Sequence, residues 1–382
     1  MKILIVTPYF PPRRGGVENY TYNISKRLAE KGHEVTVLST GNTAEETCDD
    51  FEVIRIKNKV SISNTPLNMS LAFKLSKILK KEDFDVVNAH MPVPFYADMT
   101  AITSKWNNIR FVLTYHNDVI KDGFLKILSA FYNKSLLQLT LRLSDKIITP
   151  SPYVYNESHI IKKFSDKTVL IPPGVDPNFY KPGRSHIKKK YNLPQNSKVI
   201  LFIGTMNRGH AHKGVDILLR AFSKIKSNEV RLVLAGGGNR IPEYKRLARS
   251  LGIANKTIFT GFIDEKSLIS LYRGSYMLVL PTLTAAEGFG MVLIEANACG
   301  KPVIGSKVGG IKYVIKDGKT GLLVPPGDPE ALTKAIEKLL EDEELAKKMG
   351  SNGRKMVKEN YTWDRVAKIT EKVFEGVVYG SS

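Results

Sequence analysis

Two successive series of short apolar runs constrain the fold of this 382-residue chain more than any other sequence feature. The runs of the first series alternate with segments of helical spacing and read KILIVT, EVTVLST, DVVNAH, FVLTYH and KIITPS. The second series restarts the pattern with VILFIGT, RLVLAGGG, TIFTGF, YMLVLP, KPVIGS and GLLVPP. Such alternation is typical of parallel sheets wound with helices, so we predict an α/β fold with two doubly wound, Rossmann-like domains.

A polar, basic and proline-rich stretch over residues 172–197 separates the two series and reads as a linker, with a boundary near residue 185. The predicted domains are therefore residues 1–185 and 186–360. Apolar residues recur at helical spacing over residues 361–382, and this helix is expected to cross back and pack on the first domain. Doubly wound folds bind ligands at the carboxyl ends of their strands, which places the predicted site in a cleft between the domains.

The composition argues against several classes of protein. Only Cys48 and Cys299 are present, far apart and without metal-ligand spacing, which excludes a disulfide scaffold and a zinc site and favours a reducing, cytoplasmic location. The N-terminal apolar run passes straight into prolines, so it is predicted to be a buried strand and not a secretion signal. No apolar stretch reaches the roughly 18 residues that cross a bilayer.

The net charge of +20 favours a polyanionic partner such as nucleic acid, an anionic lipid surface or a phosphate-bearing substrate. Lysine and arginine concentrate over residues 53–81 and 181–249. These regions lack aromatic platforms and nucleic-acid-binding motifs, so nucleic acid is not the predicted partner.

The loop after the first strand reads PRRGGVENY and carries Gly15 and Gly16 just before a predicted helix over residues 17–31. A glycine turn at a helix N-terminus lets backbone amides approach a phosphate, although it is equally suited to a tight strand-to-helix turn. A dinucleotide fold would require G-x-G-x-x-G here and an acidic residue after the second strand, and both are missing.

Three further candidates follow strands. His116 comes after FVLTY, where an imidazole can donate a hydrogen bond to a substrate hydroxyl. Arg208 and Lys213 lie in GTMNRGHAHKG, before a helix predicted over residues 215–226, and two cations at a helix start suit a diphosphate leaving group. A structural histidine and solvated surface charges are the alternatives.

The segment EGFGMVLIE is the most informative motif. Glu287 precedes a glycine turn and Glu295 is expected two turns inside the following helix, so that both can face one cavity. A carboxylate within so apolar a segment needs a partner, and a ribose diol offers two hydroxyl donors. A buried lysine or arginine partner is the alternative.

These motifs together resemble the retaining glycosyltransferases of family 4, which have the two-domain GT-B fold. The resemblance covers nearly the whole chain and rests on GGVE, on His116 after a strand, on Arg208 and Lys213 five residues apart, on the Glu287–Glu295 motif and on the closing YTWDRVA. Two histidines between Arg208 and Lys213 depart from the expected pattern and leave the donor preference open.

The resemblance implies a role for each residue. Gly16 would lie against the diphosphate of the donor, and His116 would contact the transferred sugar. Glu295 would bind the ribose. Arg208 and Lys213 would bind the oxygens of the diphosphate. The transferred sugar would also be held by Glu287 together with the backbone of Gly288, Phe289 and Gly290. The base would be bordered by Gly261, Phe262 and Ile263.

The resemblance further implies a retaining transfer of a hexose from a UDP- or GDP-sugar, with no metal and no other cofactor. A metal-dependent alternative would use Asp83 and Asp85, but these precede their strand and so lie at the wrong end of it. A silent relative that only binds the nucleotide-sugar, and a basic nucleic-acid-binding protein, are the remaining alternatives.

The acceptor is not identified by the sequence, and a lipid-linked glycan is one possibility. Lys74, Lys77 and Lys81 form one stripe of a predicted helix whose other stripe is apolar, so the helix can rest on an anionic membrane from the cytoplasmic side. An ordinary sheet-packing helix with a solvated lysine face is the alternative.

Overall fold

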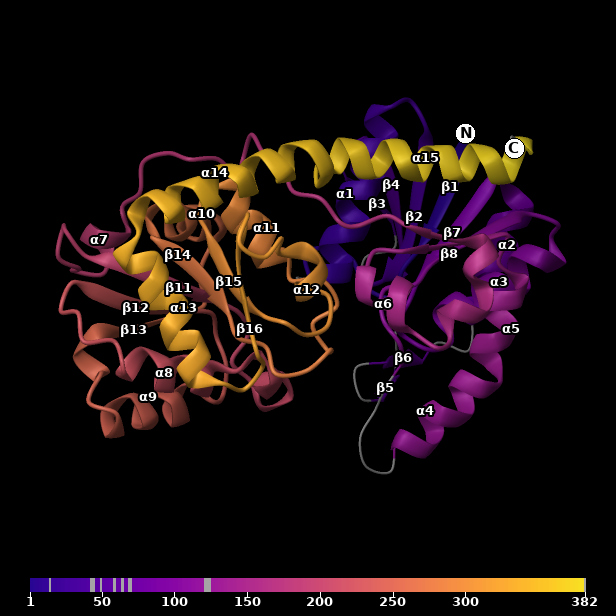
Figure 1. Ribbon diagram of the computed structural model, residues 1–382. Coiled ribbons are helices and arrows are strands. Elements are labelled where there is room, and N and C mark those ends of the chain that lie inside the picture. Colours follow the sequence, from indigo (N-terminus) through magenta and orange to yellow (C-terminus); the bar gives the residue numbers. More distant parts are fainter. Residues whose placement is uncertain are drawn as a thin grey trace. The chain divides into compact units, whose positions relative to one another are not determined.

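The computed structural model describes residues 1–13, 15–41, 45–48, 50–57, 60–62, 65–67, 71–119 and 125–380 (Figure 1). The chain forms two compact units. The first comprises Met1–Pro173 together with Trp363–Ser382, and the second comprises Gly174–Thr362. Each unit has its own parallel sheet and its own core of buried aliphatic side chains, as two doubly wound domains require.

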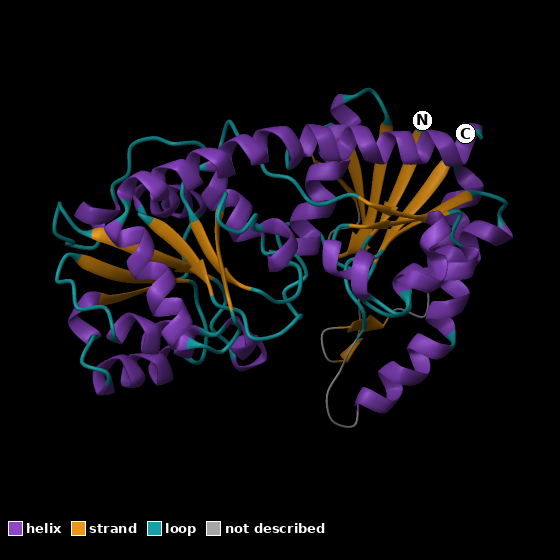
Figure 2. Ribbon diagram, in the orientation of Figure 1, coloured by secondary structure: helices purple, strands orange, loops and turns teal. Residues whose placement is uncertain are grey.

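The sheet of the first unit has the strand order β10-β9-β8-β7-β1-β2-β4-β3 and is parallel except for β3. Its strands are β1 (Lys2–Val6), β2 (Glu34–Thr40), β3 (Glu45–Cys48), β4 (Phe51–Ile56), β7 (Val86–His90), β8 (Arg110–Thr114), β9 (Lys146–Thr149) and β10 (Thr168–Leu170). A separate hairpin pairs β5 (Val60–Ile62) with β6 (Thr65–Leu67). The central strands are largely buried because helices cover both faces of the sheet (Figure 2).

The helices of the first unit are α1 (Gly16–Glu30), α2 (Leu71–Lys81), α3 (Tyr96–Trp106), α4 (Leu125–Lys134), α5 (Leu136–Leu143), α6 (Pro152–Glu157) and α15 (Trp363–Tyr379). The terminal helix α15 packs beside α1. Arg27 pairs with Asp364 at 3.2 Å, and the rings of Tyr20 and Trp363 meet edge to face at 5.6 Å. Residues from the two ends of the chain therefore build one unit.

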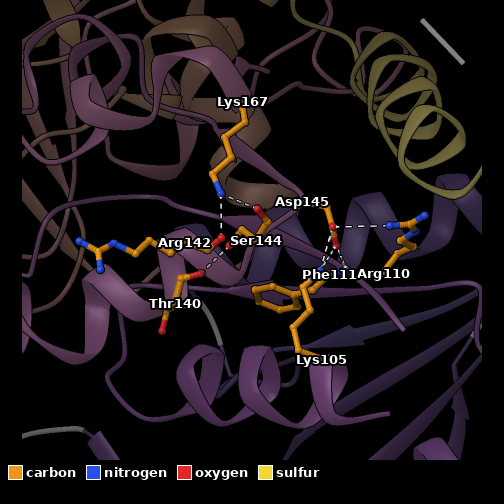
Figure 3. A network of polar contacts seen from close by, with 8 residues as sticks. All are labelled: Lys105, Arg110, Phe111, Thr140, Arg142, Ser144, Asp145 and Lys167. Atoms are coloured by element: carbon orange, nitrogen blue, oxygen red, sulfur yellow. Dashed lines mark hydrogen bonds and ion pairs between the residues drawn. The ribbon is translucent and has the colours of Figure 1, made fainter. Parts of the chain in front are cut away.

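Ion pairs and backbone hydrogen bonds fasten the amino-terminal edge of this sheet (Figure 3). The Asp145 carboxylate accepts hydrogen bonds from the Phe111 backbone N–H at 2.7 Å and from Lys105 Nζ at 2.8 Å. Lys167 Nζ donates to the carbonyl oxygens of Arg142 and Ser144 at 3.1 and 2.6 Å. These contacts join the start of β8 to the ends of α3 and α5, on the edge opposite to the predicted ligand site.

The sheet of the second unit is parallel throughout and has the order β13-β12-β11-β14-β15-β16. Its strands are β11 (Lys198–Ile203), β12 (Val230–Ala235), β13 (Thr257–Gly261), β14 (Met277–Leu280), β15 (Val303–Ser306) and β16 (Gly321–Val324). Its helices are α7 (Ile187–Lys190), α8 (Val215–Ser223), α9 (Ile241–Ser250), α10 (Glu265–Gly274), α11 (Met291–Ala298), α12 (Ile311–Val314), α13 (Pro329–Glu341) and α14 (Glu343–Asn360). Short 3-10 turns complete both units at Ile161–Lys167, Arg208–Lys213 and Ala254–Lys256.

The structure divides the chain after Pro173, earlier than the boundary predicted near residue 185. The reason is that the proline-rich stretch already packs on the second unit. Val175 is buried, and its N–H donates to the Tyr361 carbonyl at 2.8 Å. The crossing to the first unit correspondingly comes at Trp363, two residues after the predicted start of the last segment.

The apolar stripe of helix α2 packs into the core of the first unit. Leu71, Leu75 and Leu79 are buried, whereas Lys74, Lys77 and Lys81 are exposed. Among the described helices, none is both long and apolar enough to span a membrane.

Candidate active site

The second unit has a topological switch point between β11 and β14. Connections from β11 lead to β12 and β13 on one side, and those from β14 lead to β15 and β16 on the other. The loops that follow these two neighbouring strands therefore diverge, and doubly wound folds bind ligands in the crevice that such loops leave. Arg208 and Lys213 lie in the loop after β11, and Glu287 lies in the loop after β14.

The two loops are joined by direct contacts. Lys213 Nζ donates a hydrogen bond to Glu287 Oε2 at 2.6 Å, and both side chains are mostly buried, with exposures of 17% and 18%. The Leu283 N–H donates to the His212 carbonyl at 2.7 Å. Gly214 has φ +67°, and a Cβ there would collide with the Pro281 carbonyl oxygen. The structure thus brings one predicted cation and one predicted carboxylate together at the switch point.

Each of these loops ends at the start of a helix. Gly214 is the N-cap of α8 and Gly290, with φ +85°, is the N-cap of α11. Neither cap has a side chain that could accept from the first amides of its helix. Backbone N–H groups and positive helix ends therefore accompany Lys213 on this edge of the sheet, a combination suited to an anion.

Arg208 is exposed, and its backbone is fixed by a neighbouring loop. Its N–H donates to Asn239 Oδ1 at 3.1 Å, and the Asn239 N–H donates to Asn207 Oδ1 at 2.9 Å. Asn239 follows the glycines of RLVLAGGG, and the sequence pattern of this segment predicts only a strand and its end. A Cβ at Gly236 or Gly238 would collide with the backbone of Gly204 or Met206. The triple glycine was the available signal for this close approach.

A second glycine pair supports the Glu287 loop and was also missed. The Gly310 N–H donates to the Glu287 carbonyl at 3.0 Å. A Cβ at Gly310 would overlap the Gly288 carbonyl, and one at Gly309 would lie 2.7 Å from the Glu287 carbonyl oxygen. The sequence signal is VGG after the strand VIGS.

Glu295 lies in α11, as predicted, but about one turn inside the helix and not two, because α11 begins at Met291. It is 9% exposed, and its carboxylate accepts a hydrogen bond from the Tyr272 hydroxyl. Burial raises its pKa to about 7, although the Tyr272 hydrogen bond acts in the opposite direction. The partner of this buried carboxylate within the chain is thus a tyrosine, neither a lysine nor an arginine.

The predicted base-lining residues follow β13. Gly261 has φ +66°, and its carbonyl accepts from the Gly236 N–H at 3.1 Å. Phe262 is 75% exposed and Ile263 is partly buried. An exposed aromatic ring at the carboxyl edge of the sheet presents an apolar face to the solvent.

The two unexpected histidines, His210 and His212, lie beside Lys213. Burial lowers the pKa of both side chains, and the Lys213 charge lowers it further. The positive charge of the loop therefore comes from Arg208 and Lys213 when no anion is bound.

In the first unit the loop after β1 contains both predicted glycines. Gly15 is the N-cap of α1 and Gly16 is its first residue. A Cβ at Gly16 would meet nothing within 4 Å, whereas one at Gly15 would collide with the Glu18 carboxylate, which pairs with Arg13 at 3.4 Å. The backbone of Gly16 is therefore uncovered, whereas the lack of a side chain at Gly15 leaves space for the Glu18 carboxylate.

His116 follows β8 and is 9% exposed. Its Nε2 lies 3.1 Å from Nδ1 of His90, the last residue of β7, and the Tyr20 ring meets it edge to face at 5.2 Å. Burial lowers the pKa of His116 to about 3, so its imidazole is neutral at physiological pH. His90 was not predicted, because it reads as an ordinary member of the strand VVNAH.

The alternative metal-binding pair lies elsewhere. Asp85 precedes β7 and accepts from the Lys2 N–H at 2.7 Å, at the amino-terminal edge of the first sheet. The described residues contain no group of three or more His, Cys, Asp or Glu side chains arranged as a metal site would need.

Comparison with known proteins agrees with these features. The family model described as Glycosyltransferase Family 4 matches residues 14–179, and that described as Glycosyl transferases group 1 matches residues 183–356. The chain belongs to glycosyltransferase family 4. This confirms the resemblance inferred from the order of the motifs, and it makes the protein a glycosyltransferase.

Two curated relatives illustrate the likeness. The O-antigen chain mannosyltransferase C of Escherichia coli is 29% identical over 371 residues, which cover 96% of each chain. A GDP-mannose-dependent α-(1-6)-phosphatidylinositol monomannoside mannosyltransferase of Mycolicibacterium smegmatis is 28% identical over 388 residues, covering 97% of each chain. Among solved structures, a glycosyltransferase from Rickettsia africae superposes with a TM-score of 0.80 at 25% identity and full coverage of both chains. The predicted GT-B class, with two Rossmann-like domains, is thereby confirmed.

Proposed function

We propose that this glycosyltransferase transfers a hexose from a nucleotide-sugar whose diphosphate binds at the switch point of the second unit. The observation that carries the proposal is the Lys213–Glu287 hydrogen bond, which places a cation and a carboxylate where the β11 and β14 loops diverge. A diphosphate there would meet Lys213, Arg208 and the amino ends of α8 and α11. Such a set of donors stabilises the negative charge that develops on the leaving group.

The remaining donor contacts are assigned to residues that follow strands in each unit. We assign Glu295 to the ribose. Its buried carboxylate accepts one hydrogen bond, from the Tyr272 hydroxyl, and can still accept hydrogen bonds from two further hydroxyls. Gly261, Phe262 and Ile263 would line the base. Glu287, with the backbone of Gly288, Phe289 and Gly290, would hold the transferred sugar. His116 would contact that sugar and Gly15 and Gly16 would approach the diphosphate from the first unit.

The base of the donor is proposed to be guanine or uracil. One relative is named for its dependence on GDP-mannose, and the relative from Escherichia coli is named a mannosyltransferase, which supports a GDP-hexose. Burial and the Lys213 charge lower the pKa of His210 and His212 in the absence of donor, whereas a bound diphosphate would act in the opposite direction.

The transfer is proposed to retain the anomeric configuration and to need no metal. Arg208 and Lys213 can supply the charge that a divalent cation would otherwise bring to a diphosphate. Activity is therefore expected to survive EDTA. Loss of activity on chelation, restored by a divalent cation, would contradict this part of the proposal.

The acceptor is proposed to be a glycan or lipid-linked molecule at the cytoplasmic membrane surface. Lys74, Lys77 and Lys81 are exposed on α2, and Phe73 beside them is 75% exposed. Each lysine near an anionic surface contributes about 1 kcal/mol. Changing all three lysines to Glu is expected to reduce flotation with anionic vesicles, whereas the same change at Lys348, Lys355 and Lys358, which are also exposed, serves as the matched control. Equal flotation of both triple variants would contradict docking through α2.

The test of the function begins with thermal-shift screening against UDP-, GDP- and ADP-sugars, since a ligand of the folded state raises the melting temperature. The best donor, radiolabelled in its sugar, is then incubated with the full chain with and without membrane extract. Transfer of label, or slow hydrolysis without acceptor, is expected from an enzyme. If a nucleotide-sugar raises the melting temperature but is neither hydrolysed nor transferred, the result would favour a protein that binds the donor without catalysing a reaction.

A further inference from the structure

Two buried histidines on neighbouring strands of the first unit are in direct contact. His90 ends β7 with no exposed surface, and His116 follows β8 with 9% exposure. Their rings stack at 5.4 Å between centroids, with 30° between planes. His90 Nδ1 and His116 Nε2 are 3.1 Å apart, so one nitrogen donates and the other accepts.

A third residue determines the direction of this hydrogen bond. Thr21 Oγ1 donates its single hydrogen to the Val17 carbonyl at 2.8 Å, and the same oxygen lies 3.4 Å from His90 Nδ1. Because this hydrogen is already donated to Val17, the Thr21 hydroxyl can only accept a hydrogen bond from His90. His90 Nδ1 therefore carries the proton, which it shares between Thr21 Oγ1 and His116 Nε2.

The other nitrogen of His90 agrees with this assignment. Nε2 is buried and makes no hydrogen bond to any described residue. An unprotonated nitrogen there leaves only a lone pair unused, whereas an N–H would leave a donor unpaired in the interior. The Tyr20 ring packs edge to face against both imidazoles, at 5.9 and 5.2 Å between centroids.

We propose that His90 is a positioning residue that holds His116 in the tautomer with its proton on Nδ1, and so presents His116 to the bound sugar as a hydrogen-bond donor. Because Nε2 accepts from His90, the hydrogen of a neutral His116 must be on Nδ1. That N–H can pair with a sugar oxygen but cannot remove a proton from one. The proposal rests on the proposed function only for the presence of the sugar.

The tautomer itself can be measured without substrate. Nitrogen NMR of the full chain labelled at histidine distinguishes protonated from unprotonated ring nitrogens, and loss of one signal set in His116→Asn assigns His116. We expect Nδ1 of His116 to be protonated in the wild-type protein and in His90→Asn, whose amide can donate near the position of Nδ1. In His90→Leu we expect the proton to be found on Nε2. Protonated Nε2 in the wild-type protein would overturn the proposal.

Kinetics then test the consequence. His90→Leu is expected to lower kcat about 100-fold while leaving the KM for the donor nearly unchanged, since a misplaced contact costs rate more than ground-state binding. His90→Asn is expected to restore most of kcat. His33→Asn, which alters a histidine paired with Glu371 at 2.9 Å, is the control and should lower stability but not kcat.

Equal kcat in His90→Leu and the wild-type protein, with the tautomer changed, would overturn the positioning role. Loss of kcat in His90→Asn as large as that in His90→Leu, at matched melting temperatures, would do the same. Failure of the proposed function would be recognised separately, as absence of sugar transfer by the wild-type protein.

Discussion

Lys213 and Glu287 are 74 residues apart in the sequence, yet their side chains form a 2.6 Å hydrogen bond. The contact links the loops after β11 and β14, which are neighbours only because the strand order reverses between them. A bound diphosphate would compete with Glu287 for Lys213. The pair therefore neutralises a mostly buried cation in the ligand-free chain.

Replacing Lys213 by Ala is expected to lower kcat by about 10²-fold to 10³-fold, because the departing diphosphate loses a fixed cation. The measurement is steady-state transfer with the best donor. Lys224→Ala is the matched control, since Lys224 pairs with Glu330 on an exposed surface of the same unit. An equal loss in both variants would indicate a general effect of charge and would contradict the assignment of Lys213.

Stability is expected to depend on pH through Glu295. Its folded-state pKa of about 7 exceeds the ordinary 4.5, so the folded state binds this proton more tightly than the unfolded state. The stabilisation is complete below pH 4.5 and is lost as the pH rises to about 7, with a total of about 3 kcal/mol in the free energy of unfolding. Urea unfolding across this range should show the decrease, and Glu295→Gln should remove most of it. An identical decrease in the variant would assign the effect to another group.

Tyr272→Phe is expected to raise the pKa of Glu295, because it removes the hydrogen bond that favours the carboxylate. A larger protonated fraction at pH 7 leaves fewer acceptor positions for a ribose diol, so donor affinity should fall and should recover at pH 9. Calorimetric titration at both pH values measures this. Affinity as low at pH 9 as at pH 7 would mean that Tyr272 acts only through packing.

Gly310→Ala is expected to abolish most transfer, because the new Cβ would overlap the Gly288 carbonyl and displace the Glu287 loop. Gly318→Ala is the comparison variant. It has φ +72° with nothing within 4 Å, so it should cost about 1 kcal/mol of stability and leave kcat unchanged. Full activity of Gly310→Ala would show that this loop is not required in its present position.

Asp145→Ala should destabilise the first unit by about 1–3 kcal/mol, because it leaves the Phe111 N–H without its acceptor and Lys105 without its partner. Donor affinity should be unchanged, since these contacts lie at the amino-terminal edge of that sheet (Figure 3). Thermal melts with and without donor separate the two effects. The exposed Asp166→Ala is the control and should change stability by less than about 0.5 kcal/mol.

The sequence allowed the two sheets to be predicted because buried parallel strands are largely apolar runs, as in KVILFI and KILIV. It also placed Lys213 and Glu287 in loops after strands, since both follow such runs beside glycine turns. Three contacts could not be predicted in this way. Tyr272 lies in an amphipathic helix, where it reads as core, and nothing in the sequence pairs it with Glu295. His90 is indistinguishable from other strand residues, and Gly310 matters only because a distant loop packs against it.

Photoaffinity labelling tests the central claim most directly. The full chain is irradiated with an azido-base analogue of the nucleotide-sugar that gives the largest thermal shift, and the labelled peptides are mapped by mass spectrometry. Label is predicted on peptides containing residues 261–263 or 287–295, and unlabelled donor should prevent it. Label confined to residues 1–173, or spread over surface peptides and unaffected by unlabelled donor, would contradict a nucleotide-sugar site at the switch point of the second unit.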